Sequence, residues 1–208
     1  MDINQFKTHE SIRGDCYRLL AACFYQPQIE IFMEGRLLKN LTASLWHVCP
    51  EATVYSSSME KTVLNYSDEE LAVEYARLFV GPNEMTAPPY GSMYLDGEKT
   101  IMGDSTMEVI RMYQEEGLAR DSEFKDLPDH IAVELEFMYY LNFKGMKAQE
   151  QSDDKNLQEF TAKQEIFLHK LLRSWVPQFC DKIKKGTDNN FYKALAGCLY
   201  TFIIDNRN

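Results

Sequence analysis

Apolar residues recur along this chain with the spacing of an α-helix. Between residues 11 and 25 they follow one another at intervals of three or four, which places them on one helical face. This stripe consists of Ile12, Cys16, Leu19, Leu20 and Cys23. Pro27 is expected to end the helix, because proline has no backbone N–H to continue the hydrogen bonds. A second stripe predicts a helix over residues 30–48, before Pro50, and consists of Leu37, Leu38, Leu41 and Leu45.

Three later helices are expected to start at capping boxes. In this motif a side-chain oxygen accepts a hydrogen bond from the backbone N–H three residues later, and a glutamate at that position accepts one in return. The matching pairs are Ser67 with Glu70, Ser105 with Glu108 and Asn156 with Glu159. Glycine and proline terminate helices, so these helices are predicted to end at Gly81 and Pro82, at Gly117 and at Pro177.

Two further helices complete the pattern. One of about 16 residues is expected to begin near Pro128, because a proline in the first turn of a helix loses no hydrogen bond. Its apolar face consists of Ile131, Leu135, Met138 and Leu141. The last helix begins near Asp188 or Asn189 and is apolar almost all round, which predicts a buried, central position.

The fold class follows from the absence of a strand pattern. No segment alternates apolar and polar residues over a strand's length, so we predict an all-α fold of roughly eight or more helices in one domain, residues 1–208. Residues 81–104 form a long connection without a helical pattern, and such connections are often functional or act as hinges. Its aromatic residues indicate that it packs on something, with an inert connector as the alternative. We expect an N-terminal lobe over about residues 1–117 and a C-terminal lobe over about 126–208.

Charge and hydropathy narrow the choice of partner. The formal net charge is −10, from 32 acidic and 22 basic residues, which disfavours nucleic acid and favours a cationic partner. Solubility alone is an alternative reason for this charge. The N-terminus has no apolar run after a basic stretch, and the most apolar window, Ala194–Ile204, is too short to cross a bilayer. We therefore predict a cytoplasmic protein that is not integral to the membrane.

Motifs for catalysis, cofactors and metals are absent from the sequence. The five cysteines include no CxxC pair, so buried free thiols are expected in place of disulfides or a zinc site. There is no phosphate-binding glycine loop, no nucleophile elbow and no HExxH motif. His130 with Glu134 and Glu165 with His169 are spaced as ordinary helical ion pairs are. We predict a protein that is not an enzyme and holds neither a cofactor nor a metal.

Four blocks of sequence, considered together, resemble a known family. They are EYARLFVGP at residues 74–82, PPYGSMYLDGE at 88–98, LPDHIAVELEFMYYL at 127–141 and FLHKLLRSWVPQF at 167–179. In this order and spacing they are similar to the TorD/DmsD/NarJ group of cytoplasmic chaperones for molybdenum reductases. Members often have a histidine four residues before the tryptophan of the last block. Leu171 occupies that position here, with His169 nearby.

The resemblance implies an all-helical chaperone for a molybdopterin oxidoreductase catalytic subunit. Such a chaperone binds the subunit's twin-arginine signal peptide, its mature part or both, and assists cofactor insertion before export. The resemblance also implies that the Pro-Asp-His stretch recognises the leader and that the proline-rich loop contributes. We add a candidate groove of aromatic side chains, with Phe79 alternatively in the core. The predicted binding residues are Tyr75, Pro88, Pro89, Tyr90, Ser92, Tyr94, Pro128, Asp129, His130 and Glu134.

Other interpretations of the sequence stay open. A helical adaptor or regulatory protein with an unrelated protein partner would show the same periodicity and charge. The oligomeric state is open too, because lobes joined by a long hinge can exchange between chains. Both a monomer and a domain-swapped dimer are compatible with the sequence.

Overall fold

A computed structural model describes residues 3–33, 35–81, 84–97, 100–118 and 126–205. Pro82 and Glu98, which belong to the sequence blocks above, lie outside the described residues. Within the described ranges the chain is helical, and no strand is formed; the single isolated β-bridge joins Tyr90 to His130. This confirms the predicted all-α fold. The α-helices are α1 (Ile3–Ala22), α2 (Ile29–Met33), α3 (Leu37–Val48), α4 (Thr53–Thr62), α5 (Asp68–Tyr75), α6 (Ser92–Leu95), α7 (Asp104–Glu115), α8 (Ile131–Glu150), α9 (Asp154–Phe167), α10 (Arg173–Gly186) and α11 (Asn190–Asp205).

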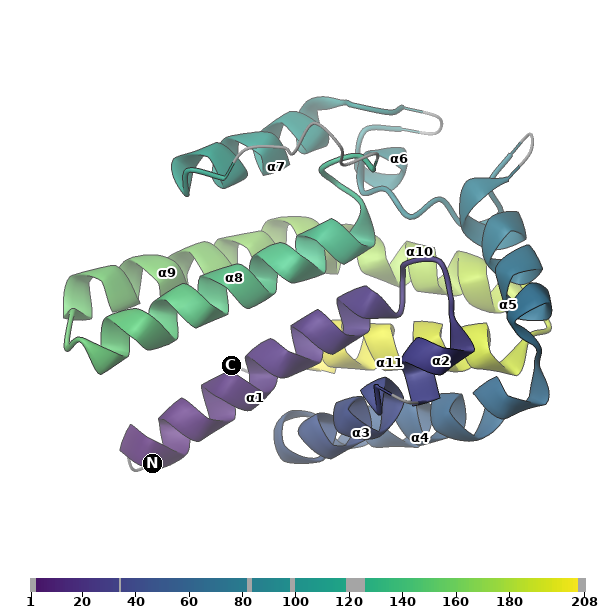
Figure 1. The fold of residues 1–208 in the computed structure, drawn as a ribbon. Coiled ribbons are helices and arrows are strands. Elements are labelled where there is room, and N and C mark those ends of the chain that lie inside the picture. The colour runs from purple at the N-terminus through teal and green to yellow at the C-terminus, as the bar shows by residue number, and fades with distance from the viewer. Residues whose placement is uncertain (1–2, 34, 82–83, 98–99, 119–125, 206–208) are drawn as a thin grey trace.

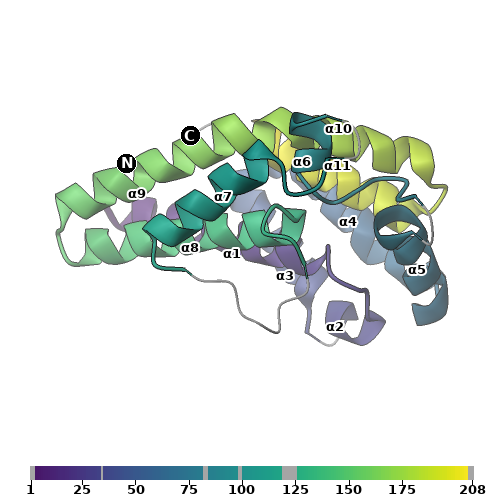
Figure 2. The ribbon, with the colours of Figure 1, turned by 90° about the horizontal axis from the view of Figure 1, so that it is seen from above.

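The helices pack around α11, which lies behind α1 in Figure 1. α11 packs against α4 and α10, and most of its apolar side chains are buried, with Tyr200 exposed, as the sequence predicted for a central helix. α8 and α9 form a hairpin along α1, and α7 lies across that hairpin (Figures 1 and 2). Helices of both expected lobes therefore pack together, α1 with α8 and α4 with α11. The lobe boundaries themselves stay a prediction.

The prediction of a single helix over residues 30–48 is wrong. It is divided into α2 and α3 around Gly35 and Arg36. A Cβ atom on Gly35 would lie 2.7 Å from the carbonyl oxygen of Ile31, and Arg36 has a left-handed backbone with φ of 51°. This conformation ends a helix, and the apolar stripe that begins at Leu37 starts a new one with its face buried.

One of the three predicted capping boxes is confirmed. The Ser67 hydroxyl accepts from the Glu70 N–H at 3.2 Å, and the Glu70 carboxylate accepts from the Ser67 N–H at 2.8 Å, so α5 starts where the sequence predicted. The other two boxes are wrong. Asp153, not Asn156, caps α9, and its carboxylate accepts from the Asn156 N–H at 3.1 Å.

The start of α7 is held by a residue from outside the helix. The carboxylate of Asp96 accepts from the Ser105 N–H at 3.0 Å and from the Ser105 hydroxyl at 2.6 Å. Glu108, the expected partner of Ser105, binds Arg111 instead. A carboxylate is the stronger acceptor, and the chain path places Asp96 beside the first turn. The helix nonetheless ends near Gly117, as predicted.

Proline placement also differs from the prediction at two helices. Pro177 lies inside α10 and does not end the preceding helix, whose last turn is a π-turn at Leu168–Leu172. A proline this close to the start of a helix removes one backbone hydrogen bond only, so α10 continues. Pro128 precedes α8, which begins at Ile131 and is 20 residues long, longer than expected.

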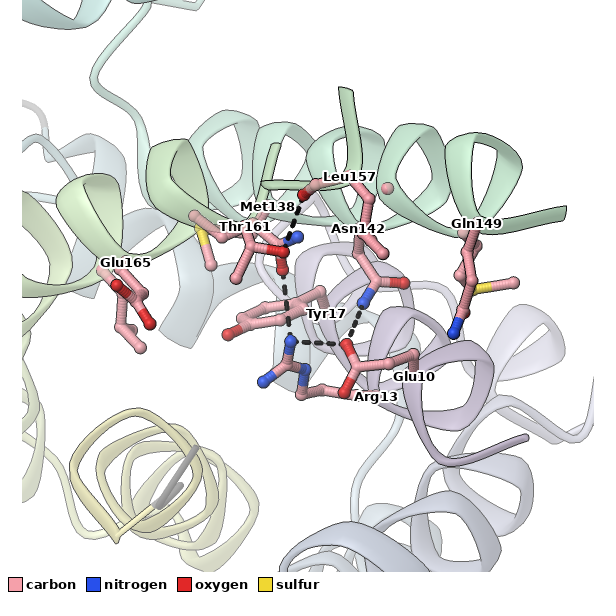
Figure 3. Close-up of a pocket in the computed structure, with 13 residues that line it drawn as sticks. Glu10, Arg13, Tyr17, Met138, Asn142, Gln149, Leu157, Thr161 and Glu165 are labelled. Carbon is pink, nitrogen blue, oxygen red and sulfur yellow. Dashed lines mark hydrogen bonds and ion pairs between the residues drawn. The ribbon is translucent and has the colours of Figure 1, made fainter. Parts of the chain in front are cut away.

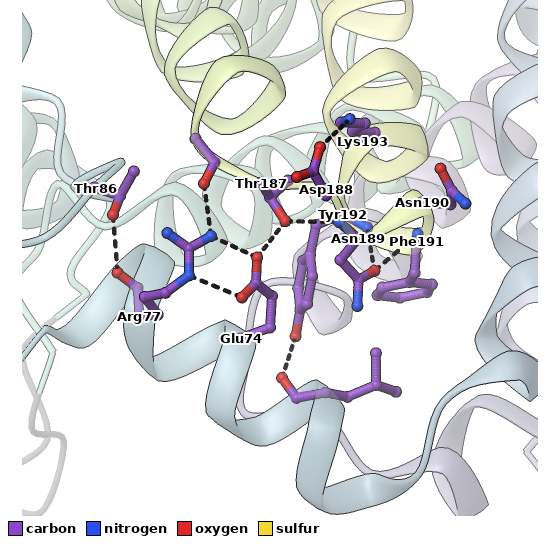
Figure 4. A network of polar contacts seen from close by, with 12 residues as sticks. Glu74, Arg77, Thr86, Thr187, Asp188, Asn189, Asn190, Phe191, Tyr192 and Lys193 are labelled. Carbon is purple, nitrogen blue, oxygen red and sulfur yellow. Dashed lines mark hydrogen bonds and ion pairs between the residues drawn. The ribbon is translucent and has the colours of Figure 1, made fainter.

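A polar network holds the end of α5 to the connection between α10 and α11 (Figure 4). The Arg77 guanidinium donates to both oxygens of the Glu74 carboxylate, at 2.8 and 2.6 Å, and to the Gly186 carbonyl at 2.6 Å. The Thr187 hydroxyl also donates to Glu74. Hydrogen bonds from Arg77 and Thr187 lower the pKa of Glu74 despite its partial burial. The network explains the Glu and Arg of the first sequence block as structural residues.

We expect Glu74→Gln to lower the free energy of unfolding by about 1–3 kcal/mol at pH 7, because one amide cannot accept all these hydrogen bonds. Urea titration followed by circular dichroism measures this loss. The carboxylate's contribution is present above the usual glutamate pKa and is lost as pH falls below it, so the difference from wild type should shrink in acid. Glu70→Gln, one helical turn away, is the control: it retains the capping box and should leave the free energy of unfolding close to that of wild type. An equal loss in both variants would contradict the role of the network.

Candidate functional site

The proline-rich loop and the Pro-Asp-His stretch, separate in sequence, meet at the start of α8. The Ile131 N–H donates to the Pro89 carbonyl at 2.8 Å, and the Gly91 N–H donates to the Asp129 carbonyl at 2.9 Å. Between these two bonds Tyr90 faces His130. The long connection is thus packed on the helical body, as its composition indicated, and it contains the short helix α6, which the sequence pattern did not predict. We call residues 88–95 together with residues 126–136 the junction.

The Asp129 side chain is enclosed within the junction, with 1% of its surface exposed. Its Oδ2 atom accepts a hydrogen bond from the Ser92 N–H at 2.8 Å. Its Oδ1 atom and the Ser92 hydroxyl are both buried, and neither has a partner among the described residues. The carboxylate therefore connects the loop to α8 from the inside, at the cost of one unsatisfied oxygen.

His130 caps α8 and is 2% exposed. Its Nδ1 atom accepts from the Ala132 N–H at 3.1 Å, so the proton of the neutral ring is on Nε2. Burial lowers the pKa of His130 to about 4, although Asp126 and Asp129 oppose this shift. The ring stacks on Tyr25 at 6.3 Å between centroids and meets Tyr90 edge-on at 5.4 Å. His130 is thus a neutral group of fixed orientation at neutral pH.

Glu134 lies one turn into α8 and is also buried, with 1% exposed. Its Oε2 atom accepts from the indole Nε1–H of Trp175 at 3.0 Å. Burial raises the pKa of Glu134 well above its usual value, and Asp129 raises it further, whereas the bond from Trp175 opposes the shift. Glu134 and His130 are thus engaged with different partners, and no ion pair between them is recorded. Trp175 in turn stacks on Tyr94 and connects the junction to α10.

The remaining predicted residues surround this buried centre. The Tyr75 hydroxyl donates to the Phe24 carbonyl at 3.2 Å, and the Tyr94 hydroxyl donates to the Pro88 carbonyl at 2.8 Å. Phe79 is 2% exposed and belongs to the core. Of the ten predicted binding residues, the buried ones are Ser92, Pro88, Pro89, Asp129, His130 and Glu134, and the partly exposed ones are Tyr75, Tyr90, Tyr94 and Pro128.

Sequence reasoning missed three residues at the rim of the junction. The Tyr25 hydroxyl donates to the exposed Glu136 carboxylate at 2.9 Å. The pKa of Tyr90 is raised by burial and further by the carboxylates of Asp126 and Asp129. Burial and then Asp126 likewise raise the pKa of Tyr75, to about 12. Asp126 precedes the Pro-Asp-His stretch by two residues, but no local pattern connects Tyr25 to it.

A second polar region lies between α1, α8 and α9 (Figure 3), where a cavity of about 150 Å³ opens. The Arg13 guanidinium donates to the Gln164 carbonyl oxygen at 3.3 Å and pairs with Glu10. The Glu10 carboxylate accepts from the buried Asn142 amide at 3.0 Å. These groups are bonded to one another across three helices, so we interpret the region as an internal network that orients α1.

In the ranges that the structure describes, no group of three or more His, Cys, Asp or Glu side chains is arranged to hold a metal ion. All five cysteines are free and buried, as predicted. None of the described helices is both long and apolar enough to cross a membrane.

Comparisons with known proteins agree with the four sequence blocks. The family model described as nitrate reductase delta subunit matches residues 49–181, which is more than half of the chain. Chaperone protein TorD of Vibrio parahaemolyticus is 32% identical over 139 residues, which cover 66% of this chain and 63% of that protein, less than two thirds of its length. Chaperone protein TorD of Aliivibrio salmonicida is 28% identical over 97% of this chain and 95% of its own. The Tat proofreading chaperone DmsD of Salmonella typhi is 28% identical over 86% and 80%.

A solved structure agrees in fold. The crystal structure of a candidate redox enzyme maturation protein from Archaeoglobus fulgidus superposes with a TM-score of 0.55, covering 90% of this chain and 92% of that one at 21% identity. This likeness supports the helical architecture alone. The family model does more, because the residues that it matches, 49–181, include the two blocks that form the junction. The chain therefore belongs to the nitrate reductase delta subunit family, within the TorD/DmsD/NarJ group that its sequence resembles.

Proposed function

We propose that this protein is a system-specific chaperone for the catalytic subunit of a molybdopterin oxidoreductase. In this proposal it binds the subunit's twin-arginine leader, its apo form or both in the cytoplasm, before export, and performs no catalysis itself. The relatives named as TorD and DmsD chaperones support the class of function. The observation that carries the proposal is the junction, where two of the family's sequence blocks are joined beside a surface of tyrosines and carboxylates.

The junction has the chemistry that a leader requires. Such a peptide has a basic start followed by an apolar stretch, and the net charge of −10 would attract it and speed encounter. Tyr25, Tyr75, Tyr90 and Tyr94 offer ring surfaces that are only partly buried. Aromatic side chains accept varied apolar peptides because they make few polar demands. The buried residues behind them hold these rings in place.

Apolar contact alone does not account for a useful affinity. Burying roughly 400 Å² of apolar surface contributes about 10 kcal/mol at ~25 cal/mol/Å². Ordering the peptide costs about 2–5 kcal/mol, and lost rigid-body freedom costs about 4 kcal/mol or more. The remainder is well below the roughly 8 kcal/mol of a micromolar complex. The basic residues of the leader must therefore contribute, and so must the carboxylates that meet them.

The test is a titration of the purified protein with a twin-arginine leader peptide, followed by calorimetry. We expect a dissociation constant on the order of micromolar at low salt, weakening as salt is added. The matched control is the same peptide with both arginines replaced by glutamine, which should bind at least about tenfold more weakly. Equal binding of the two peptides would contradict recognition of the leader.

The client is identified separately. We expect the tagged protein, purified from its source grown with molybdate, to retain a molybdopterin oxidoreductase catalytic subunit with its leader uncleaved, as mass spectrometry would show. Reproducible recovery of an unrelated protein in place of such a subunit would favour the adaptor alternative. In that case only the family and the fold would stand.

A further inference from the structure

The carboxylate of Asp129 is buried and does not reach the surface. Its carboxylate is 1% exposed and its Oδ2 atom is bonded to the Ser92 N–H, while its own carbonyl accepts from the Gly91 N–H. A client's cation could reach this carboxylate only after residues 88–95 had separated from α8. In the closed junction, Asp129 acts on its neighbours in the chain and not on a docked peptide.

The residues that Asp129 fixes are Tyr90 and His130. Tyr90 lies between Pro89 and Gly91, which are both hydrogen-bonded to the segment that carries Asp129. His130 is the next residue after Asp129, and its ring lies against Tyr25 and Tyr90. Because Nδ1 accepts from Ala132, the Nε2–H is left as a donor, and no group among the described residues is bonded to it.

Two other carboxylates lie where a client can reach them. Glu136 is exposed and accepts from the Tyr25 hydroxyl at 2.9 Å. Asp126 is partly exposed and directly precedes the turn in which the His130 N–H donates to the Leu127 carbonyl at 3.0 Å. After burial, its charge also raises the pKa of Tyr75 and of Tyr90. Carboxylates beside aromatic rings bind a guanidinium in two ways, through charged hydrogen bonds and through contact with the ring faces.

We propose that Asp126 and Glu136 hold a guanidinium of the client against Tyr25 and Tyr90, and that Asp129 is a positioning residue that does not touch the client. The proposal rests on the proposed function, because it names the charged contacts of that same surface. It assigns opposite roles to neighbouring carboxylates: the two partly or fully exposed ones recognise charge, and the buried one holds the loop that carries Tyr90.

The test compares three variants in the titration with the twin-arginine peptide. Asp129→Asn removes the charge but retains an oxygen that can accept from the Ser92 N–H, so its affinity should stay within about threefold of wild type. Asp129→Ala removes the bond as well and should bind at least about tenfold more weakly. Asp126→Asn with Glu136→Gln should also lose about tenfold, and the salt dependence of binding should flatten.

A matched control separates local charge from net charge. Glu108→Gln with Glu115→Gln on α7 removes two charges from side chains that pair with Arg111 and not with a residue of the junction, and should leave the affinity within about twofold. Circular dichroism melts show whether each variant is folded. If Asp129→Asn binds as weakly as Asp129→Ala and also loses its salt dependence, Asp129 contacts the client and the inference is overturned. No binding of the peptide by the wild type would overturn this inference together with the leader-binding part of the proposed function.

Discussion

Replacing Trp175 with alanine is expected to lower the free energy of unfolding by about 3–5 kcal/mol, the largest effect of any single change considered for this protein. The side chain is 0% exposed, and its ring contacts Tyr94 at 5.5 Å and Phe179 at 5.3 Å between centroids. The change leaves a large cavity between α10 and the junction, and it removes the donor to the buried Glu134 carboxyl. Urea unfolding followed by circular dichroism measures the loss.

The hydrogen-bonding part of this effect can be separated from the packing part. Trp175→Phe retains an aromatic ring but leaves the Glu134 carboxyl without its donor. The missing bond should lower the free energy of unfolding by about 1–3 kcal/mol, in addition to the loss caused by the smaller ring. Adding Glu134→Met replaces the orphaned acceptor with an apolar group and should recover part of that loss. Strictly additive losses in the double variant would show that the bond between Trp175 and Glu134 does not couple the two residues.

Acid should destabilise the protein through His130 before most carboxylates titrate. Burial lowers the folded-state pKa of His130 to about 4, whereas the unfolded chain has the usual value near 6.5. Between these values the unfolded state binds a proton that the folded state excludes. The contribution of neutral His130 to the free energy of unfolding is therefore fully present above about pH 6.5. It falls as pH decreases toward 4, by about 3 kcal/mol in total. Urea titrations at pH 7, 6, 5 and 4 measure this slope.

His130→Asn is the matched variant for the pH experiment. Asparagine is a good N-cap, so its side-chain oxygen can accept from the Ala132 N–H, but it does not titrate. Its stability should change less than that of wild type between pH 6.5 and 4. Parallel curves for the two proteins would mean that the pKa of His130 is not lowered in the folded state. Glu134→Gln has the opposite expectation, because the pKa of Glu134 is raised in the folded state. The wild type should lose stability as pH rises above about 4.5, so the free energy of unfolding of the variant should increase relative to that of wild type.

The local patterns of the sequence predicted the helices well and their ends unevenly. The stripe from Ile12 to Cys23 and the capping box at Ser67 depend on neighbours three or four residues apart, and both are present in the structure. The cap of α7 was not predictable in this way, because Asp96 belongs to the long connection and meets Ser105 only through the path of the chain. Arg36 in the left-handed region was missed because the stripe of leucines begins only at Leu37 and does not indicate where the preceding helix ends.

For the candidate site, the sequence indicated which blocks matter but not how each residue is used. The resemblance identified the Pro-Asp-His stretch and the proline-rich loop, and the structure brings them together through backbone bonds between Pro89 and Ile131 and between Gly91 and Asp129. Exposure is a property of the packed chain, however. The residues next to Asp129 in the sequence do not indicate that its carboxylate is buried. Nor do they indicate that Tyr25, which follows α1, lies against His130.

The sequence by itself determined the all-α class, the buried free cysteines, the central position of α11 and the family, because these depend on residue type and on spacing along the chain. Only the tertiary structure decided which carboxylates face solvent, which tautomer His130 adopts and which tyrosines surround it. Those features arise where segments distant in sequence pack against each other and exclude water. Burial and hydrogen bonding of that kind set the charge and orientation of a side chain, and local periodicity carries no record of them.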